Sequence, residues 1–163
     1  TGHRTFLDKL IGSTANHVID NIHVPMLVIP EDFSGDIFGN HGYASQLEFD
    51  EEQYIEKALI FSKQTKSNLK IVHIIEENEI DLYPDQIFIK EIHEKFGNSN
   101  IEIIESKNKN LEKGLNEIIE KESINVLSLT THKRGFLDGI LNPSKTKKLI
   151  GHSKIPILVF SIE

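Results

Sequence analysis

The sequence contains no cysteine, no tryptophan and a single methionine among its 163 residues. The absence of cysteine excludes disulfides, thiolate catalysis and cysteine-based zinc sites, and a cytoplasmic location is the expectation. No apolar run approaches the roughly 18 residues that a membrane-spanning helix needs, so no membrane partner is expected. Lysine and arginine number 18 against 25 acidic residues, and the resulting net charge of −7 argues against nucleic-acid binding.

The eight histidines carry no recognisable metal-binding pattern. Neither H-x-x-x-H nor H-x-H spacing occurs among them, and no cysteine is present to complete a site. His73 lies inside the apolar run V-H-I-I, where the prediction is a hydrogen-bonded core histidine. The sequence therefore predicts no metal site.

Two segments of the chain resemble each other at a constant shift of 131 residues. V-P-M-L-V-I begins at Val24 and I-P-I-L-V-F at Ile155, and each follows a stretch with the pattern of an amphipathic helix. A separation of this size corresponds to a whole small domain. We therefore expect residues 1–30 to be the last helix and strand of one domain, residues 31–41 to be a linker, and residues 42–163 to be a complete second domain.

Strand-like and helix-like segments alternate through the expected second domain. Asp50 and Gln53 have the spacing of a capping box at the start of a helix. The alternation predicts an α/β fold, a doubly wound sheet of five parallel strands with an N-terminal helix–strand arm. Strands are expected at 41–45, 69–75, 101–105, 124–130 and 155–160, and helices at 50–65, 84–97, around 111–119, and 144–152.

Ligands of open parallel sheets bind beyond the carboxyl ends of the strands, where the winding changes direction. If the first strand of the domain is central and the fourth lies beside it, the crevice is lined by residues 43–46 and 130–134. These two segments are the expected location of a site.

Three stretches, taken in order, resemble a known family. They read Y-A-S-Q-L-E-F-D-E-E from Tyr43, V-H-I-I from Val72, and L-T-T-H-K-R-G-F-L-D-G-I-L-N-P-S-K-T-K-K-L from Leu129. Together they resemble a universal stress protein domain over nearly all of residues 41–161. Because residues 1–30 resemble the end of a preceding domain, the whole chain is similar to part of a tandem member. The resemblance implies an ATP site built from an Asp after the first strand and a stretch G-x-x-G-(nine residues)-G-S/T, whose amides hold phosphates.

The second domain departs from that pattern. Gln46 stands at the Asp position; Thr130, Lys133 and Pro143 stand at the glycine positions; and Ser144 alone is retained. Proline has no N–H to offer a phosphate. We therefore expect a degenerate site that binds no cofactor and at most a small anion. Its residues would be Ser45, Gln46, Ile74, Thr130, Lys133 and Ser144.

The partial first copy fits the glycine pattern better, at Gly2, Gly12 and Ser13. ATP binding would then belong to an intact parent protein. For this chain we expect a stress-response binding or scaffold module, not an enzyme, that dimerises through its last strands. The alternative is an ATP-binding, weakly hydrolysing switch domain.

The two similar apolar strands are expected to pair with each other, because an apolar last strand would otherwise leave its backbone unpaired at the rim of the sheet. The resemblance implies the same pairing, within one molecule or between two. The expected partner is accordingly a second copy of the chain or a tandem domain. The strand residues expected at this seam are Pro25, Leu27, Ile29, Pro156, Leu158 and Phe160.

Overall fold

The computed structural model describes residues 24–47, 51–75, 83–97, 99, 101–132 and 153–162. The chain divides into two compact units, one of residues 1–34 with 129–163 and the other of residues 35–128. The helix expected at 144–152 and the arm helix expected within 5–19 lie outside the described residues. The division into a remnant, a linker and a complete domain stays a prediction.

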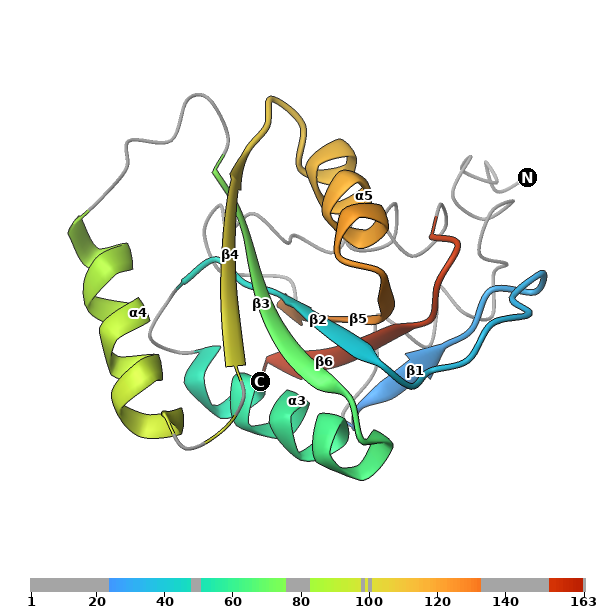
Figure 1. The fold of residues 1–163 in the computed structure, drawn as a ribbon, viewed down its shortest axis with the longest axis horizontal. Coiled ribbons are helices and arrows are strands. Elements are labelled where there is room, and N and C mark those ends of the chain that lie inside the picture. Colours follow the sequence, from blue (N-terminus) through green and yellow to red (C-terminus); the bar gives the residue numbers. More distant parts are fainter. Residues whose placement is uncertain are drawn as a thin grey trace, which may run out of the picture. The chain divides into compact units, whose positions relative to one another are not determined.

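A mixed sheet of six strands confirms the expected α/β architecture (Figure 1). The strands are hydrogen-bonded in the order β1-β6-β5-β2-β3-β4, and β5 passes from one unit into the other. Five of them match the expected strands of the second domain, and β1 is the strand of the expected arm. Their bounds are β1 Met26–Val28, β2 Asn40–Ala44, β3 Asn68–Ile75, β4 Ile101–Lys107, β5 Ile124–His132 and β6 Ile157–Ile162.

Strand β2 lies inside the sheet with β5 beside it, the arrangement on which the expected location of the crevice depended. It pairs in parallel with β3 on one side and with β5 on the other. Gly42 permits close packing here, because a Cβ at this position would lie 2.9 Å from Cδ1 of Ile124. Strand β2 begins at Asn40, one residue before the predicted start at residue 41, and pairs there with Asn68.

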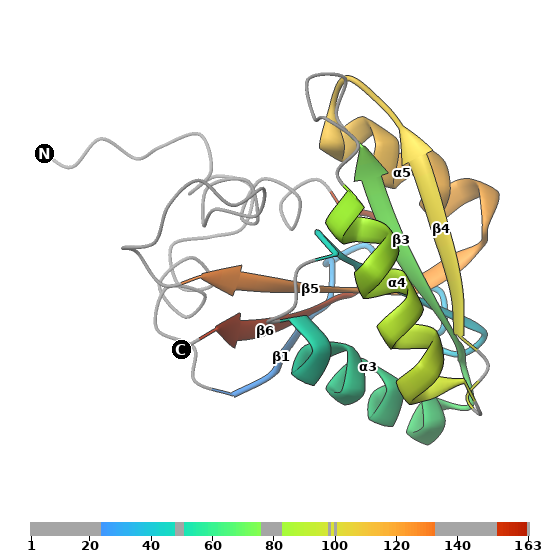
Figure 2. The ribbon, with the colours of Figure 1, turned by 90° about the vertical axis from the view of Figure 1, so that its left-hand side faces the viewer.

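The described helices are α3 (Glu52–Thr65), α4 (Tyr83–Phe96) and α5 (Leu111–Lys121). Within the unit of residues 35–128, α5 lies on the opposite face of β3 and β4 from α3 and α4 (Figures 1 and 2). The α5 helix begins conventionally, because the Asn110 side chain accepts a 3.0 Å hydrogen bond from the Lys113 amide. The three helices bury apolar stripes on the sheet, as their periodicity predicts.

The predicted capping box of the first of these helices is wrong. The N-cap of α3 is Glu51, not Asp50, and the Glu51 side chain makes no capping hydrogen bond. With Glu51 as the N-cap, Gln53 is the second residue of the helix and not the third, which is the position that a capping box requires. The Glu51 carboxylate instead turns back to the end of β2, where it forms part of the candidate site.

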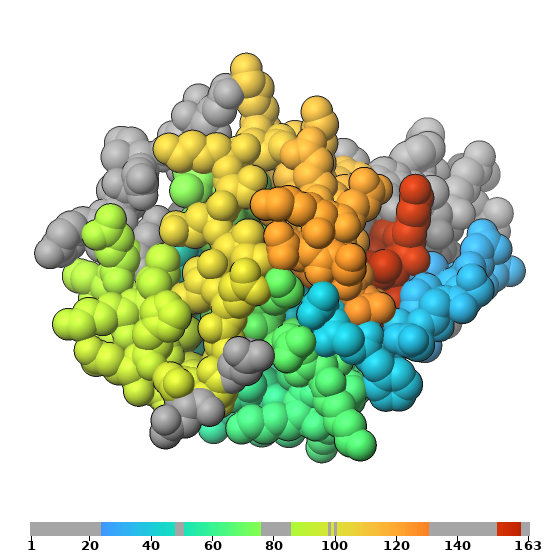
Figure 3. All heavy atoms as spheres, in the orientation of Figure 1, coloured from blue at the N-terminus to red at the C-terminus, as the bar shows by residue number. Residues whose placement is uncertain are grey.

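Strand β4 is an edge strand whose side chains reach the surface between those of α4 and α5 (Figure 3). It carries exposed charged residues at every second or third position, namely Glu102, Glu105 and Lys107. Charges on an edge oppose pairing with a strand of another molecule.

Strands β1 and β6 pair with each other in antiparallel orientation, within one chain. The pairing brings Leu27 opposite Leu158, as the expected seam requires. Strand β1 is shorter than the predicted run of residues 24–29, since Pro25 precedes it and Ile29, 56% exposed, follows it. Strand β6 begins two residues later than predicted, after Pro156, and Leu158 and Phe160 are buried.

Candidate binding site

The described part of the candidate site is built at the carboxyl ends of β2 and β3. Ser45 follows β2 directly, and its amide donates a 2.9 Å hydrogen bond to the Val72 carbonyl. The Ser45 carbonyl lies 3.0 Å from Nδ1 of His73. His73 is buried and hydrogen-bonded, which confirms its prediction as a core histidine. These contacts fix the turn that leaves β2.

Glu51 places a buried carboxylate against this turn. Its side chain is held by the Ser45 hydroxyl at 2.6 Å, the Gln46 amide at 2.9 Å and the Tyr43 hydroxyl at 3.4 Å. The residue is only 2% exposed. A buried carboxylate is stable only when hydrogen-bond donors replace its water, and these three donors do so. The N-terminus of α3, where Glu51 is the N-cap, adds favourable electrostatics.

The turn after Gln46 is held in a strained conformation. Leu47 has φ of +59°, in the left-handed region that non-glycine residues seldom occupy. Its amide donates a 2.9 Å hydrogen bond to the Ser45 hydroxyl, and its side chain is 3% exposed. The Ser45 hydroxyl therefore serves two partners at once, as donor to Glu51 and as acceptor from Leu47.

Thr130, near the end of β5, is another predicted site residue that the structure describes. It is 1% exposed, and its Oγ1 has no hydrogen-bond partner in the part of the chain that the structure describes. Ile74 is also buried, within β3. The remaining predicted binding residues lie outside the described residues: Lys133, Ser144, Gly2, Gly12 and Ser13.

Sequence reasoning missed Glu51 as a member of this site. Glu51 lies five positions beyond Gln46, in the acidic run of residues 50–52. By itself this run predicts only the start of a helix. A run of three acids before a helix usually indicates favourable interaction with the helix dipole. The positive φ of Leu47, which follows the segment that binds Glu51, has no signal in the sequence.

His41 is a second buried polar residue that the sequence did not single out. Its ring nitrogens lie 2.6 Å from the Ser62 hydroxyl and 2.5 Å from the Ser128 hydroxyl. The ring also packs edge-on against Phe61, with centroids 5.1 Å apart. Burial lowers the pKa of His41 to about 4, against a weaker opposing effect of a hydrogen bond with the Ala58 backbone. His41 is 0% exposed, which makes it a core residue and not a ligand group.

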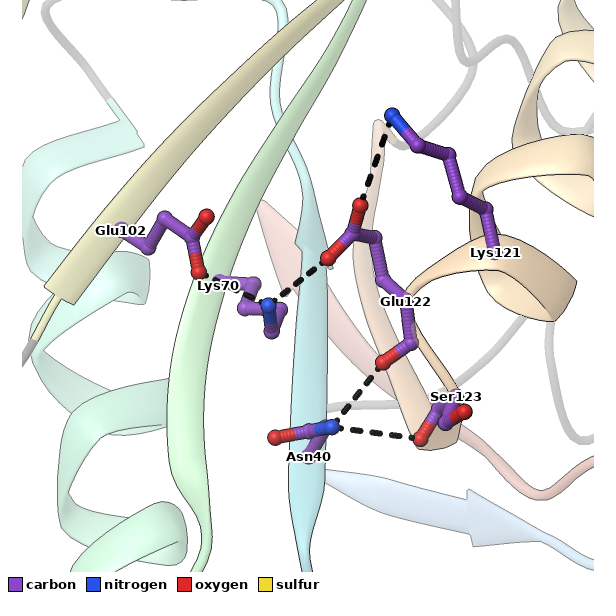
Figure 4. A network of polar contacts seen from close by, with 6 residues as sticks. All are labelled: Asn40, Lys70, Glu102, Lys121, Glu122 and Ser123. Carbon is purple, nitrogen blue, oxygen red and sulfur yellow. Dashed lines mark hydrogen bonds and ion pairs between the residues drawn. The ribbon is translucent and has the colours of Figure 1, made fainter.

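A separate polar network lies at the amino ends of the strands (Figure 4). The Lys70 ammonium contacts Glu102 at 2.7 Å and Glu122 at 2.9 Å. The pKa of Lys70 is raised, first by its hydrogen bond to Glu102 and next by its hydrogen bond to Glu122. The hydrogen bond from Lys70 in turn lowers the pKa of Glu122. The Asn40 side chain donates to the Glu122 and Ser123 carbonyls. The network joins β2, β3 and β4 to the turn before β5, and we assign it a structural role.

No group of three or more potential metal ligands occurs among the described residues. Within the same residues, no helix has the length and apolar character needed to cross a membrane.

The strands and helices define a doubly wound α/β fold, and this fold resembles that of several solved structures. A universal stress protein from Archaeoglobus fulgidus DSM 4304 matches 96% of the chain with a TM-score of 0.70 and 18% identity. A functionally unknown protein from Pseudomonas aeruginosa PAO1 matches 98% with a TM-score of 0.68 and 14% identity. A protein from the universal stress protein family of Burkholderia pseudomallei matches 78% with a TM-score of 0.53 and 12% identity.

The chain thus has the fold of universal stress proteins. It spans 56% of the length of the Archaeoglobus structure and 60% of that of the Pseudomonas structure, whereas it covers 98% of the Burkholderia protein. No protein-family model matches the sequence, and no curated protein matches it significantly. The likeness at these identities shows the fold, which confirms the fold that the resemblance implied.

Proposed function

We propose that this chain is a stress-response binding module of the universal stress protein family that performs no chemistry of its own. The fold supports this assignment, and so does the local chemistry at the end of β2. A cytoplasmic location is part of the proposal, in keeping with a sequence that has no cysteine.

The observation that carries the proposal is the engagement of Glu51. The resemblance implies a nucleotide read by a carboxylate directly after the first strand, where this chain has Gln46. The carboxylate present at this strand end belongs to Glu51, and Ser45, Gln46 and Tyr43 already donate to it. A nucleotide would have to displace a buried, triply hydrogen-bonded carboxylate to use these donors. The described residues therefore do not fit ATP, and we propose a degenerate nucleotide site.

The phosphate side of the site supports the same conclusion. Thr130, Lys133 and Pro143 occupy the positions at which the resemblance implies glycines. Side chains at these positions hinder the close approach of backbone amides to a phosphate, and proline has no amide hydrogen. The hydroxyl of Thr130, which has no hydrogen-bond partner among the described residues, favours residual binding of a small anion, the weaker function that the site would retain.

Calorimetry with Mg-ATP tests the proposal directly. We expect the chain to show no heat of binding, and we expect the variant Gln46→Asp to show none either, because the acid alone does not restore the phosphate amides. Binding by the unaltered chain with a dissociation constant tighter than about 10 µM, about 7 kcal/mol of binding energy, would instead establish the switch-domain alternative. Phosphate release above that of a buffer control would extend this alternative to hydrolysis.

Association through the last strand is the second part of the proposal. The outer edge of β6 is covered by β1 of the same chain. We propose that a strand of a tandem domain or of a second copy of the chain pairs with β6 in the place that β1 occupies here.

A further inference from the structure

The two halves of helix α3 are held to the sheet by different kinds of contact. In the first half the buried side chains are large or apolar, namely Tyr54, Ile55, Ala58 and Leu59. Beyond Leu59 the buried residues of the helix are Ser62 and Thr65, whereas Ile60 is 51% exposed. The end segment of α3, residues 60–65, therefore contributes little of the apolar burial that holds the helix in place.

His41 of β2 anchors this end segment to the sheet. Its Nδ1 lies 2.6 Å from the Ser62 hydroxyl, and its ring packs edge-on against Phe61. The Thr65 hydroxyl bonds to the Phe61 and Ser62 carbonyls and to Ser67, so these bonds do not tie the segment to a strand. Among the described residues, the hydrogen bond that joins the end segment to the sheet is the one between Ser62 and His41.

The residues packed around His41 carry no charge that could balance a protonated ring. Its paired neighbours on β3 and β5 are Leu69 and Val126. Its Nε2 lies 2.5 Å from the Ser128 hydroxyl of β5, and the Ala58 backbone of α3 also forms a hydrogen bond with it. A buried charge without an opposing charge is costly, so protonation of His41 requires access of water to the ring.

The titratable residues on the same face of the sheet lie further along the strands. Tyr43 is two positions beyond His41 on β2, and its hydroxyl donates to Glu51 at the opposite end of α3. His73 is on β3, and its Nδ1 bonds to the carbonyl that follows β2. The charged residues of α3 are on its exposed or half-buried side, namely Glu52, Glu56, Lys57 and Lys63.

We propose that residues 60–65 form a proton-sensitive flap: protonation of His41 releases the end segment of α3 from the sheet while the first half of the helix stays bound. The open flap lets water reach the imidazolium, and the apolar side chains before residue 60 keep the helix seated. Opening also uncovers the ring of Phe61 beside the exposed Ile60, which gives the acidic form an apolar surface that the neutral form lacks. The flap goes beyond the proposed function and does not depend on the nucleotide site.

The size of the effect follows from proton linkage. Burial lowers the pKa of His41 to about 4 in the closed form, and an open flap restores the ordinary value near 6.5. The open form therefore binds a proton that the closed form does not. The equilibrium constant for opening should rise about 20-fold between pH 7 and pH 5.

Native-state hydrogen exchange of the unaltered chain tests the flap. The amides of residues 62–65 should exchange through a local opening that low urea concentrations do not change, whereas the amides of β3 should exchange through urea-dependent unfolding. The amides of Ala58 and Leu59 should behave like those of β3. After correction for intrinsic exchange rates, the protection of residues 62–65 should fall about 20-fold from pH 7 to pH 5.

Two histidine variants show whether His41 is the group that responds. His41→Asn removes the titrating ring, and its end segment should lose the acid dependence. His93→Asn changes an exposed histidine of α4 and should keep it. Acid dependence that persists in His41→Asn would overturn the proposal, because another group would then be responsible.

The unaltered chain decides the question by itself should His41→Asn not fold. The proposal is wrong if residues 62–65 share the urea dependence of β3, because the segment would then open only with the whole unit. It is equally wrong if their corrected protection is the same at pH 5 and pH 7. Neither measurement involves ATP, so the flap and the degenerate nucleotide site stand or fall separately.

Discussion

At the scale of single residues, His41 shows how burial sets the charge of a side chain. A neutral imidazole has one donor nitrogen and one acceptor nitrogen, and the hydroxyls of Ser62 and Ser128 can complement both. A protonated imidazole would have two donors and a charge that the surrounding core does not offset. The folded protein therefore holds the pKa of His41 at about 4, whereas the unfolded chain has the ordinary value near 6.5.

This difference predicts a loss of stability in mild acid. Between pH 6.5 and pH 4 the unfolded chain binds a proton at His41 that the folded protein does not, so the free energy of unfolding falls as the pH falls. The full loss from this residue is about 3 kcal/mol. Urea unfolding measured across this pH range checks the effect.

The exposed histidine His93 of α4 provides the control for that experiment. His41→Asn should be less stable at neutral pH, and its stability should depend less steeply on pH than that of the unaltered chain. His93→Asn should keep the original dependence. An undiminished slope in His41→Asn would mean that another group is responsible.

At the scale of elements, Gly114 lets α5 lie close to β3. A Cβ at this position would be 2.9 Å from Cγ2 of Ile74 and 3.0 Å from Cβ of Asn108. Glycine is a poor helix former, but here its lack of a side chain allows α5 to pack closely against β3.

We expect Gly114→Ala to destabilise the protein by about 1–3 kcal/mol, because the steric conflict with Ile74 outweighs the gain in helix propensity. Asn116→Ala, on the exposed face of the same helix, gains propensity without a conflict and should be neutral or slightly stabilising. Denaturant unfolding of both variants distinguishes the two contributions. A Gly114→Ala variant as stable as Asn116→Ala would show that α5 can move away from β3 without cost.

The elements differ in how well the sequence predicted them. Short apolar runs located β3, β4 and β5, and helical periodicity located all three described helices, because burial of these elements imposes such patterns on the sequence. The pairing of β1 with β6 was also predicted, from the unpaired edge that an apolar last strand would leave and from the resemblance, although its antiparallel orientation was not. The site was predicted less completely. The contact of Glu51 with Ser45 and the positive φ of Leu47 beside it are local backbone and side-chain arrangements, and such arrangements leave no periodicity in the sequence.

At the scale of the whole molecule, the two edges of the sheet differ in chemistry. Exposed charged side chains mark β4 at one edge, whereas β1 at the other edge consists of Met26, Leu27 and Val28. An edge strand without charge is a template for pairing with other chains, and charge at the edge suppresses it. We infer that association is confined to one edge by the charges on the other.

Neutralising β4 should therefore create a second point of association. We expect Glu105→Val combined with Lys107→Val to cause concentration-dependent aggregation, detectable by light scattering. Lys90→Val with Glu91→Val changes the same number of charges at exposed positions of α4 and should leave the protein dispersed. Equal aggregation of the two variants would attribute the effect to surface hydrophobicity and not to the strand edge.

The antiparallel pairing of β1 with β6 also determines how the chain responds to tension. Met26, the first residue of β1, lies beside Val159 of the last strand. Force applied between residue 24 and residue 162 would load that pair first, then Leu27 with Leu158, and then Val28 with Ile157. The bonds would open one after another, as in a zipper, and not together, as in a strand pulled lengthwise past its neighbour. Strand β1 should therefore peel away at low force, before the parallel strands of the sheet yield.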